Sequence, residues 1–440
     1  MTDTSFAAVV MAGGLGTRMR SDTPKHLHPI LGRRMVDWVL EAARPLAPSP
    51  LVVVASLESR DAFGETTVAV QERPLGTGDA VRAARDAVGD GTTDLLVLSG
   101  DTPLLTSELL QALLETHAAD GAAATVLTFE PAETRSYGRV VRAADGSVAA
   151  IVEAADATPE QLQLRECNTS IYVFRSDLLW PTLERLRPAN AQGELYLTDA
   201  IRDLSERGER VGAHRADDAA ETEGVNTRVE LAAAAAALRD RINTAHMLAG
   251  VAIGDPRSTW IEPTVELEAD ATVHPFTVLR GSTRVGRGAE VGPHVVAVDA
   301  TIGPGASVGP FCYLRPGTVL GPRSKAGTFV ELKKALLGEG TKVPHLSYLG
   351  DAEIGEDTNI GAGSITANLP HRRGLPKATT RIGDNVRVGV DTVFIAPVDV
   401  GDDAWTAAGS VVTDDVPAGA LAGFPPKQVT KEGRGGKRDD

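Results

Sequence analysis

The chain has 440 residues, of which 42% are hydrophobic and 23% are charged, and its formal net charge is −15. This length predicts two domains, and this composition is typical of a globular protein and not of a disordered one. The acidic balance argues against nucleic-acid or membrane-surface binding, because both need a basic face. Any anionic substrate must therefore be met by locally placed arginines and lysines.

The cysteines and the N-terminus indicate a cytoplasmic protein. Cys167 and Cys312 are too few for a disulfide scaffold and lack metal-ligand spacing, so we interpret them as reduced thiols. The N-terminus begins with polar residues and continues into a strand-like run, which is not the pattern of a signal peptide. No apolar run approaches the roughly 20 residues that span a bilayer.

The first half, residues 1–226, alternates strand-like and helical segments. Apolar runs such as FAAVV at 6–10 and DLLVLS at 94–99 are separated by amphipathic segments such as GDAVRAARDAV at 78–88. This alternation predicts an α/β, Rossmann-like domain with a mostly parallel sheet, whose ligands bind at the carboxyl ends of the strands. An Ala-rich run at 227–248 predicts one long helix, and we interpret residues 227–250 as a linker.

After Gly250 an apolar residue recurs at every sixth position. The members are Ile302, Val308, Leu314, Leu320, Ala326 and Leu332, then Leu337, Val343 and Leu349, then Ile354 and Ile360, and finally Ile382, Val388, Phe394, Val400, Thr406 and Val412. This spacing is the hexapeptide repeat of a parallel β-helix, in which three hexapeptides form one triangular coil. We predict a left-handed β-helix over residues 251–427 and a flexible tail over 428–440. Known β-helices of this type usually assemble as trimers.

The stretch MAGGLGTRM at 11–19 follows the first strand, and TPKHL at 23–27 comes soon after it. Glycines at this point let the backbone approach a ligand, and their amides can hold phosphate oxygens, although a tight turn alone would also need them. Neither the P-loop nor the dinucleotide-binding glycine pattern is complete here. What fits is Gly14-x-Gly16-Thr-Arg18 followed by Pro24-Lys25, which resembles the signature of the sugar-1-phosphate nucleotidyltransferases.

Further motifs extend the resemblance along the whole chain. They are QERPLGTGDA, LSGDTPLL, YGRVV, IVEAADAT, ECNTSIYVF, NAQGELYLTDA and EGVNTR in the first half, and GPFCYLRPGT, FVELKKALLG and KVPHLSYLGDAEIGEDTNIGAGSITAN in the second. Together they resemble the bifunctional uridyltransferase–acetyltransferases of bacterial cell-wall precursor synthesis. The resemblance implies a cytoplasmic homotrimer that acetylates glucosamine-1-phosphate with acetyl-CoA. It would then transfer uridylyl from UTP to N-acetylglucosamine-1-phosphate, releasing pyrophosphate, with Mg²⁺ as cofactor.

The resemblance implies these roles in the first half. Arg18 and Lys25 would offset the charge that develops on the attacked phosphorus and on the leaving pyrophosphate. The carboxylate of Asp101 and the side chain of Asn226 would hold Mg²⁺, which prefers hard oxygens. The nucleotide would contact Ala12, Gly13, Gly14, Gln71, Gly76 and Thr77. The sugar phosphate would contact Gly138, Glu153, Asn168, Tyr196 and Thr198.

In the second half the resemblance makes His345 the general base that removes a proton from the glucosamine amine. Histidine suits this role because its ordinary pKa lies near the working pH. The sugar phosphate would contact Arg315, Lys333, Tyr348, Asn359 and Lys377. Acetyl-CoA would contact Ala362, Asn368 and Ala408.

The sequence departs from the family pattern around acetyl-CoA. Leu369 and Pro370 stand in place of a tyrosine and an aspartate, Val390 in place of a serine, and Pro425 in place of an arginine. Three alternatives therefore stay open. They are a different nucleotidyltransferase with a hexapeptide tail, a regulatory or scaffold subunit of the same shape, and a uridyltransferase whose β-helix serves only trimerisation.

Overall fold

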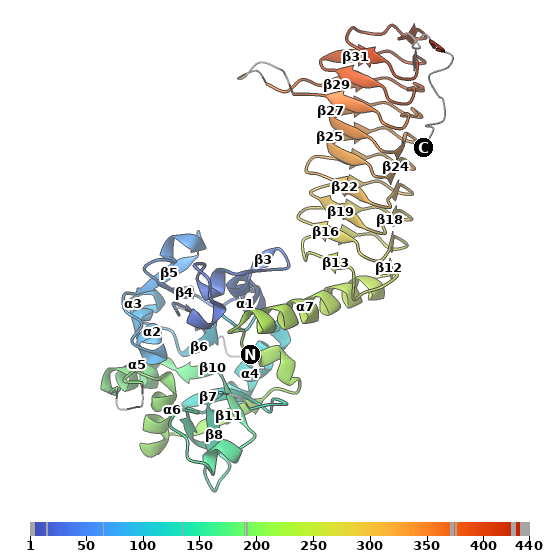
Figure 1. Cartoon of the computed structure of the whole chain (residues 1–440). Coiled ribbons are helices and arrows are strands. Elements are labelled where there is room, and N and C mark those ends of the chain that lie inside the picture. The colour runs from blue at the N-terminus through green and yellow to red at the C-terminus, as the bar shows by residue number, and fades with distance from the viewer. Residues whose placement is uncertain are drawn as a thin grey trace, which may run out of the picture. The chain divides into compact units, whose positions relative to one another are not determined.

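The computed structural model describes residues 5–14, 16–64, 66–134, 136–188, 190, 192–369, 374, 376–423 and 428–431. The chain divides into two compact units, Met1–Ala237 and Leu238–Asp440. The division falls within helix α7 (Arg228–Leu248), which occupies the run where one long helix is predicted (Figure 1). None of the described helices combines the length and the apolar character needed to cross a membrane.

A mixed sheet forms the centre of the first unit, with the strand order β11-β7-β10-β6-β1-β4-β5. These strands are β1 (Phe6–Ala12), β4 (Leu51–Ser56), β5 (Thr67–Gln71), β6 (Asp94–Ser99), β7 (Ala124–Phe129), β10 (Cys167–Arg175) and β11 (Val211–Arg215). All neighbours in this order pair in parallel except β10, which runs antiparallel to β6 and to β7. The α/β domain with a mostly parallel sheet is therefore confirmed, with one antiparallel strand inside it.

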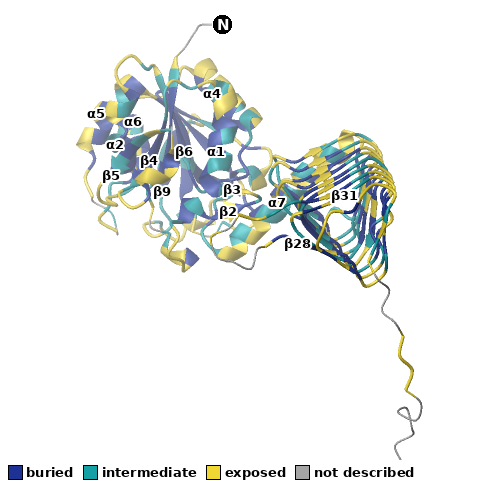
Figure 2. Ribbon diagram, turned by 90° about the horizontal axis from the view of Figure 1, so that it is seen from above, coloured by how far each residue is buried: buried dark blue, intermediate teal, exposed yellow. Residues whose placement is uncertain are grey.

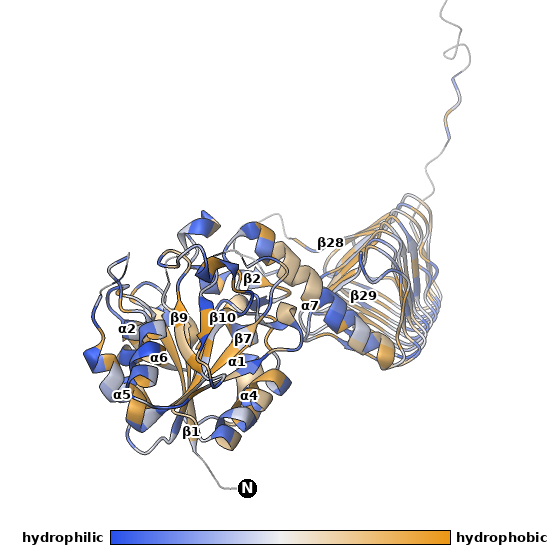
Figure 3. Cartoon of the chain, turned by 90° about the horizontal axis from the view of Figure 1, so that it is seen from below, coloured by the Kyte–Doolittle hydropathy of each residue, from blue (hydrophilic) through white to orange (hydrophobic). Residues whose placement is uncertain are grey.

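Two antiparallel hairpins complete the strands of this unit, β2 (Pro29–Ile30) with β3 (Arg33–Arg34) and β8 (Arg139–Arg142) with β9 (Val148–Val152). The helices are α1 (Met35–Ala43), α2 (Thr77–Ala83), α3 (Arg85–Val88), α4 (Ser107–Asp120), α5 (Ser176–Arg185) and α6 (Leu197–Glu206). They cover both faces of the sheet, and an apolar core lies on each side (Figure 2). The central strands are strongly hydrophobic, whereas the helices present mixed faces, as expected for elements with one side exposed (Figure 3).

The second unit consists of short parallel strands that stack into coils. They are β12 (Ala252–Ile253), β13 (Trp260–Ile261), β14 (Glu266–Leu267), β15 (Thr272–Val273), β16 (Val278–Arg280), β17 (Arg284–Val285), β18 (Glu290–Val291), β19 (Val295–Val298), β20 (Thr301–Ile302), β21 (Ser307–Val308), β22 (Cys312–Leu314), β23 (Val319–Leu320), β24 (Lys325–Thr328), β25 (Glu331–Leu337), β26 (Lys342–His345), β27 (Tyr348–Ile354), β28 (Ile365–Ala367), β29 (Thr380–Ile382), β30 (Val393–Ile395), β31 (Val398–Val400), β32 (Trp405–Thr406), β33 (Val411–Val412) and β34 (Leu421–Ala422).

Strands of successive coils pair in parallel, for example Ile261 with Leu279 and Val291 with Val308. Every member of the predicted sixfold apolar series is buried, so the series forms the interior ladder of the coils. The predicted parallel β-helix of hexapeptide repeats is confirmed. Both cysteines, Cys167 and Cys312, are buried and free of disulfide bonds.

The topology of the first unit places several loops at one edge of its sheet. Strands β1, β4, β5 and β6 run in parallel, so their carboxyl ends lie side by side. The glycine turn after Ala12, the loop after Gln71 and the turn after Ser99 therefore meet at this edge, which is where open α/β sheets bind ligands.

Candidate active sites

A cavity of about 500 Å³ opens at the carboxyl edge of the sheet. Its lining includes all the residues predicted for the nucleotide and the metal except Ala12, namely Gly13, Gly14, Gln71, Gly76, Thr77, Asp101 and Asn226, together with Arg18 and Lys25. Ala12 is the buried last residue of β1 and lies behind the glycine turn. Segments that are distant in the sequence thus form one hollow.

Two glycines are required by the shape of this hollow. Gly16 has a φ of +60°, and a Cβ on it would lie 2.3 Å from the Cβ of Lys25. Gly76 has a φ of +118°, and a Cβ there would lie 2.5 Å from the carbonyl oxygen of Leu195. Both conformations are open to glycine and costly for other residues. They let the two loops approach the cavity as bare backbone.

A charged network lies at the base of the cavity. The Lys25 ammonium forms an ion pair with Asp101 and donates to Oδ1 of Asn226 at 2.7 Å. Arg18 donates to the same Asn226 oxygen at 2.8 Å, and the Ser99 hydroxyl donates to Asp101 Oδ1 at 2.6 Å. Oxygens from two distant segments therefore converge on one cation. Hard oxygens in this arrangement also suit a divalent cation such as Mg²⁺.

Electrostatics keep this carboxylate charged and its histidine neighbour neutral. Burial alone would raise the pKa of Asp101, but the Lys25 ammonium and the Ser99 hydroxyl outweigh it and help to lower that pKa to about 2. His26, which is only 5% exposed and lines the same cavity, has its pKa lowered to about 4 by burial. At neutral pH the network therefore contains one carboxylate, two cations and an uncharged imidazole. The described residues include no cluster of three or more His, Cys, Asp and Glu that could hold a metal.

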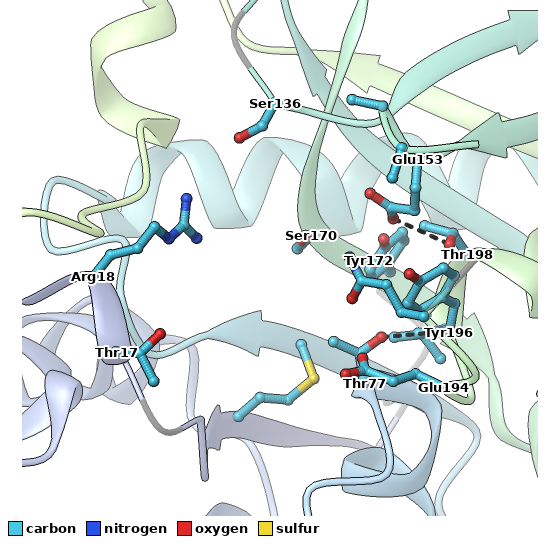
Figure 4. A pocket seen from close by; sticks show the side chains of 15 residues that line it. Thr17, Arg18, Thr77, Ser136, Glu153, Ser170, Tyr172, Glu194, Tyr196 and Thr198 are labelled. Atoms are coloured by element: carbon cyan, nitrogen blue, oxygen red, sulfur yellow. Dashed lines mark hydrogen bonds between the residues drawn. The ribbon is translucent and has the colours of Figure 1, made fainter. Parts of the chain in front are cut away.

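A second hollow of about 700 Å³ shares a wall with the first, and Arg18 lines both (Figure 4). Glu153, Tyr196 and Thr198 form its opposite side and face Arg18 across the hollow (Figure 4). The Thr198 hydroxyl donates to Glu153 Oε1 at 3.2 Å, and burial raises the pKa of Glu153. Burial and nearby carboxylates raise the pKa of Tyr196 to about 12. This hollow therefore offers hydroxyls and a carboxylate as hydrogen-bond partners for a polyhydroxy ligand.

Two of the predicted sugar residues lie behind this wall. The buried Asn168 side chain donates to the Tyr172 hydroxyl at 2.8 Å and accepts from the backbone N–H of Ser170 at 3.1 Å. A Cβ on Gly138 would lie 3.1 Å from Cγ2 of Ile151 and 3.4 Å from Oε2 of Glu153, so Gly138 packs directly against this wall. These residues support the wall and are not part of the lining.

The β-helix carries a second cluster of cations. Arg315 and Lys333 lie on adjacent coils, because their neighbours Leu314 and Leu332 pair in register. Arg315 donates to Glu331 Oε1 at 2.9 Å. The neighbouring cation Lys377 lowers the pKa of Lys333, which indicates that the two ammonium groups are close together. An anion such as a phosphate would relieve the repulsion between these neighbouring cations, so the cluster is suited to bind one.

His345 lies on a corner of the β-helix with Ala362 and Ala408, two of the three residues predicted for acetyl-CoA. Four residues of successive coils pair in register, namely Lys342, Asn359, Arg387 and Trp405. Three residues after each of them the chain reaches this corner, at His345, Ala362, Val390 and Ala408. His345 is exposed and its carbonyl accepts from the Ser347 hydroxyl at 2.8 Å. Within the described chain, no hydrogen bond or ion pair joins the His345 side chain to Arg315 or Lys333.

The departures from the family pattern are partly visible. Val390 lies between Ala362 and Ala408 on this corner, so an apolar side chain that is 48% exposed occupies the position where a serine is expected. Leu369 is also exposed, and Asn368 donates to the Asp351 carboxylate. Tyr348 lies beside them, since a Cβ on Gly350 would be 2.5 Å from its hydroxyl. Pro370 and Pro425 lie outside the described residues.

The sequence did not indicate several residues that line the cavities of the first unit, and Ser170 and His26 are two of them. Ser170 lines both hollows because β10 has an irregularity between Asn168 and Tyr172, and Ser170 has a φ of +62° there. A bulge redirects a side chain in this way without a clear signature in one sequence. His26 enters the site only because its ring is buried between the glycine turn and Gly100.

Comparison with known proteins covers nearly the whole chain. Residues 8–203 match the MobA-like NTP transferase domain family, and residues 379–414 match the hexapeptide repeat of succinyl-transferase. The chain is similar to the bifunctional protein GlmU of Streptomyces avermitilis (50% identity) and of Streptomyces coelicolor (49%), with 94% of this chain and 91% of each relative covered. It is also similar to GlmU of Mycobacterium marinum, at 47% identity over 94% of this chain and 90% of that protein.

Proposed function

The chain belongs to the family of bifunctional GlmU proteins, and we propose that it makes UDP-N-acetylglucosamine in two steps. The β-helix acetylates glucosamine-1-phosphate with acetyl-CoA, and the first unit then transfers uridylyl from UTP to the product. The observation that carries the proposal is that each unit has its own cluster of cations suited to a phosphate. These clusters are Arg18 with Lys25, and Arg315 with Lys333 and Lys377.

In the acetylation, the cations of the β-helix bind the sugar phosphate and Tyr348 and Asn359 contact the sugar. His345 takes a proton from the amine as the nitrogen attacks the thioester carbonyl of acetyl-CoA. The tetrahedral intermediate then collapses and expels the CoA thiolate. The side chains of Ala362 and Ala408 are small, so they leave room beside His345 for the pantetheine arm to run along the corner.

In the uridylyl transfer, a phosphate oxygen of N-acetylglucosamine-1-phosphate attacks the α-phosphorus of UTP in line, and pyrophosphate leaves. The larger hollow takes the sugar and the smaller one takes the nucleotide, so Arg18 lies where the two reacting phosphates meet. Arg18 and Lys25 offset the charge that develops there. Asp101 and Asn226 would hold Mg²⁺, which when bound neutralises phosphate charge. Support for this comes from the two oxygens that already share one cation.

We further propose a cytoplasmic homotrimer. Its support is the position of His345, which lies on a different face of the coils from the cation cluster. A neighbouring subunit could then complete the acetylation site. The regulatory-subunit alternative is disfavoured, because a subunit without activity has no need of the linked Arg18, Lys25, Asp101 and Asn226 side chains. The uridyltransferase-only alternative keeps one argument, the apolar Val390 on the proposed acetyl-CoA corner.

One experiment tests both halves. The purified full chain is given glucosamine-1-phosphate, acetyl-CoA, UTP and Mg²⁺, and free CoA, pyrophosphate and UDP-N-acetylglucosamine are measured. We expect all three in equal amounts. Asp101→Ala should stop pyrophosphate release and leave CoA release, whereas His345→Ala should do the reverse when N-acetylglucosamine-1-phosphate is supplied. Wild-type protein that uses only N-acetylglucosamine-1-phosphate would refute the acetylation half.

A further inference from the structure

One ladder of the β-helix presents a row of cations that ends in a tryptophan. Lys325 pairs with Lys342, and Lys342, Asn359, Arg387 and Trp405 follow in register on successive coils. The cationic residues of this row are exposed, and Trp405 is 59% exposed. A protein with a net charge of −15 has little reason to gather cations beside an open indole unless an anion binds there.

Arg387 has no acidic partner among the described residues. Arg387 donates to the backbone carbonyls of Asp357 at 2.7 Å and Val386 at 3.3 Å, and in the described chain no carboxylate pairs with it. Arg381, six residues earlier on another face of the same coil, is a contrasting case. Its guanidinium lies 3.2 Å from Glu353 and 3.6 Å from Asp399. Carboxylates on two sides therefore balance the positive charge of Arg381, whereas no carboxylate in the described chain pairs with the charge of Arg387.

The row runs beside the corner on which the acetylation chemistry is proposed. Asn359 is level with Ala362, Arg387 with Val390 and Trp405 with Ala408, so the row and the corner extend in the same direction. His345 lies on the coil of Lys342, and Arg387 and Trp405 lie two and three coils further along. Coils are ~4.8 Å apart, so the two side chains lie about 10 and 14 Å beyond His345 along the coil axis. A ligand whose reactive end is near His345 would therefore bring its far end to these two side chains.

Acetyl-CoA has a far end of matching chemistry. That end is an adenine with a diphosphate and a 3′-phosphate, separated from the thioester by the pantetheine arm. Arginine binds phosphate oxygens through charge-assisted hydrogen bonds, and an exposed indole stacks on a base. We propose that Arg387 and Trp405 bind the 3′-phosphoadenosine diphosphate of acetyl-CoA, with the guanidinium on phosphate and the indole on adenine. This inference rests on the proposed acetyl transfer.

The test uses the full chain with adenosine 3′,5′-bisphosphate as a probe and with acetyl-CoA and acetyl-dephospho-CoA as substrates. Arg387→Ala and Trp405→Ala are compared with Arg381→Ala as the matched control and with Trp405→Phe as the conservative variant. Arg387→Ala and Trp405→Ala should each weaken probe binding, measured by calorimetry, and raise the KM for acetyl-CoA by about tenfold. The KM for glucosamine-1-phosphate and the uridylyl transfer should not change. Arg381→Ala should behave as wild type, and Trp405→Phe should retain most of the affinity.

Two readouts separate the possible failures. If Arg387 binds the 3′-phosphate, its loss should remove most of the wild-type preference for acetyl-CoA over acetyl-dephospho-CoA. If Arg387→Ala and Trp405→Ala match Arg381→Ala in probe binding and KM, the inference is wrong, even with acetyl transfer intact. If the chain binds the probe through these residues but transfers no acetyl group, the nucleotide site stands and the proposed acetylation fails. If the variants change the mass of the assembly in light scattering, this face is an interface between copies and the inference is overturned.

Discussion

Replacing Lys25 by methionine removes the counter-charge of Asp101 while keeping most of the buried side-chain volume. The two side chains are 10% and 17% exposed, so the pair is largely shielded from water. The pKa of Asp101 falls from its ordinary 3.8 to about 2, and each pKa unit is worth about 1.4 kcal/mol. The ionised carboxylate therefore stabilises the first unit by about 2 kcal/mol at neutral pH. Lys25→Met should lose at least about this much, because the carboxylate then remains buried without its ammonium.

The pH dependence gives the sign of the effect. The folded-state pKa of Asp101 lies below the unfolded value, so its contribution is fully present above about pH 4 and disappears as the pH falls through about 2. At pH 3 about half of it should remain. The wild type should therefore lose stability on acidification from pH 5 to pH 3 more steeply than Lys25→Met. In the variant, burial is expected to raise the pKa of Asp101, so part of the penalty is relieved as the carboxylate takes up a proton.

Urea unfolding of the first unit at pH 7, 5 and 3 measures these differences. Arg44→Met is a suitable control, because the ion pair of Arg44 with Glu41 is open to water, the two side chains being 54% and 40% exposed. Uridylyl transfer by Lys25→Met should fall by about 10²–10³-fold, as for the loss of one group that stabilises developing charge. Equal stability of Lys25→Met and wild type at pH 7 would refute the electrostatic reasoning. So would a stability difference between the two proteins that stays constant from pH 7 to pH 3.

Three further changes test other parts of the molecule. His345→Ala should abolish release of free CoA in a thiol assay and leave pyrophosphate release unchanged, and equal loss of both products would contradict separate sites. Gly16→Ala should lower the urea midpoint of the first unit by the equivalent of about 1–3 kcal/mol, because its Cβ would meet Lys25 in a left-handed backbone conformation; Gly121→Ala, in the same left-handed conformation but with open space around the new Cβ, is the control. Val390→Ser should raise kcat/KM for acetyl-CoA severalfold without affecting UTP, and a variant that is no better than wild type would show that the missing hydroxyl is immaterial.

The fold could be predicted from the sequence because its signals are local and periodic. The sixfold apolar series needs no knowledge of distant contacts, since each coil repeats the same interior position. Two of its three interruptions, those after Leu332 and Leu349, have a structural reason. Strands β25 and β27 each continue for seven residues across the place where the spacing shortens to five. Because these two strands pair in register, Leu332 still pairs with Leu349 and Leu337 with Ile354.

The sites were only partly predictable, because they depend on contacts between distant segments. The sequence placed Asp101 at the end of a strand and Lys25 after a glycine turn, but their direct ion pair follows from the parallel order of β1 and β6. Ser170 reaches the cavities because β10 is irregular at this point, and no pattern in the sequence predicts that irregularity. The row that ends at Arg387 and Trp405 was missed for a similar reason. Its members are 17, 17, 28 and 18 residues apart along the chain and come together only through the register of the coils.

The placement of charge reconciles an acidic chain with anionic substrates. With a net charge of −15, the long-range field repels anions, and beyond a Debye length of about 8 Å at physiological salt that field is screened. Attraction must then come from cations within contact range of the phosphates. Many arginines, such as Arg142 and Arg381, form ion pairs with carboxylates. In contrast, Lys333 and Lys377 lie close to each other, and Arg387 pairs with no carboxylate in the described chain. Such local attraction favours small phosphorylated ligands that fit a hollow or a corner, because an extended polyanion would also meet the acidic surface around it.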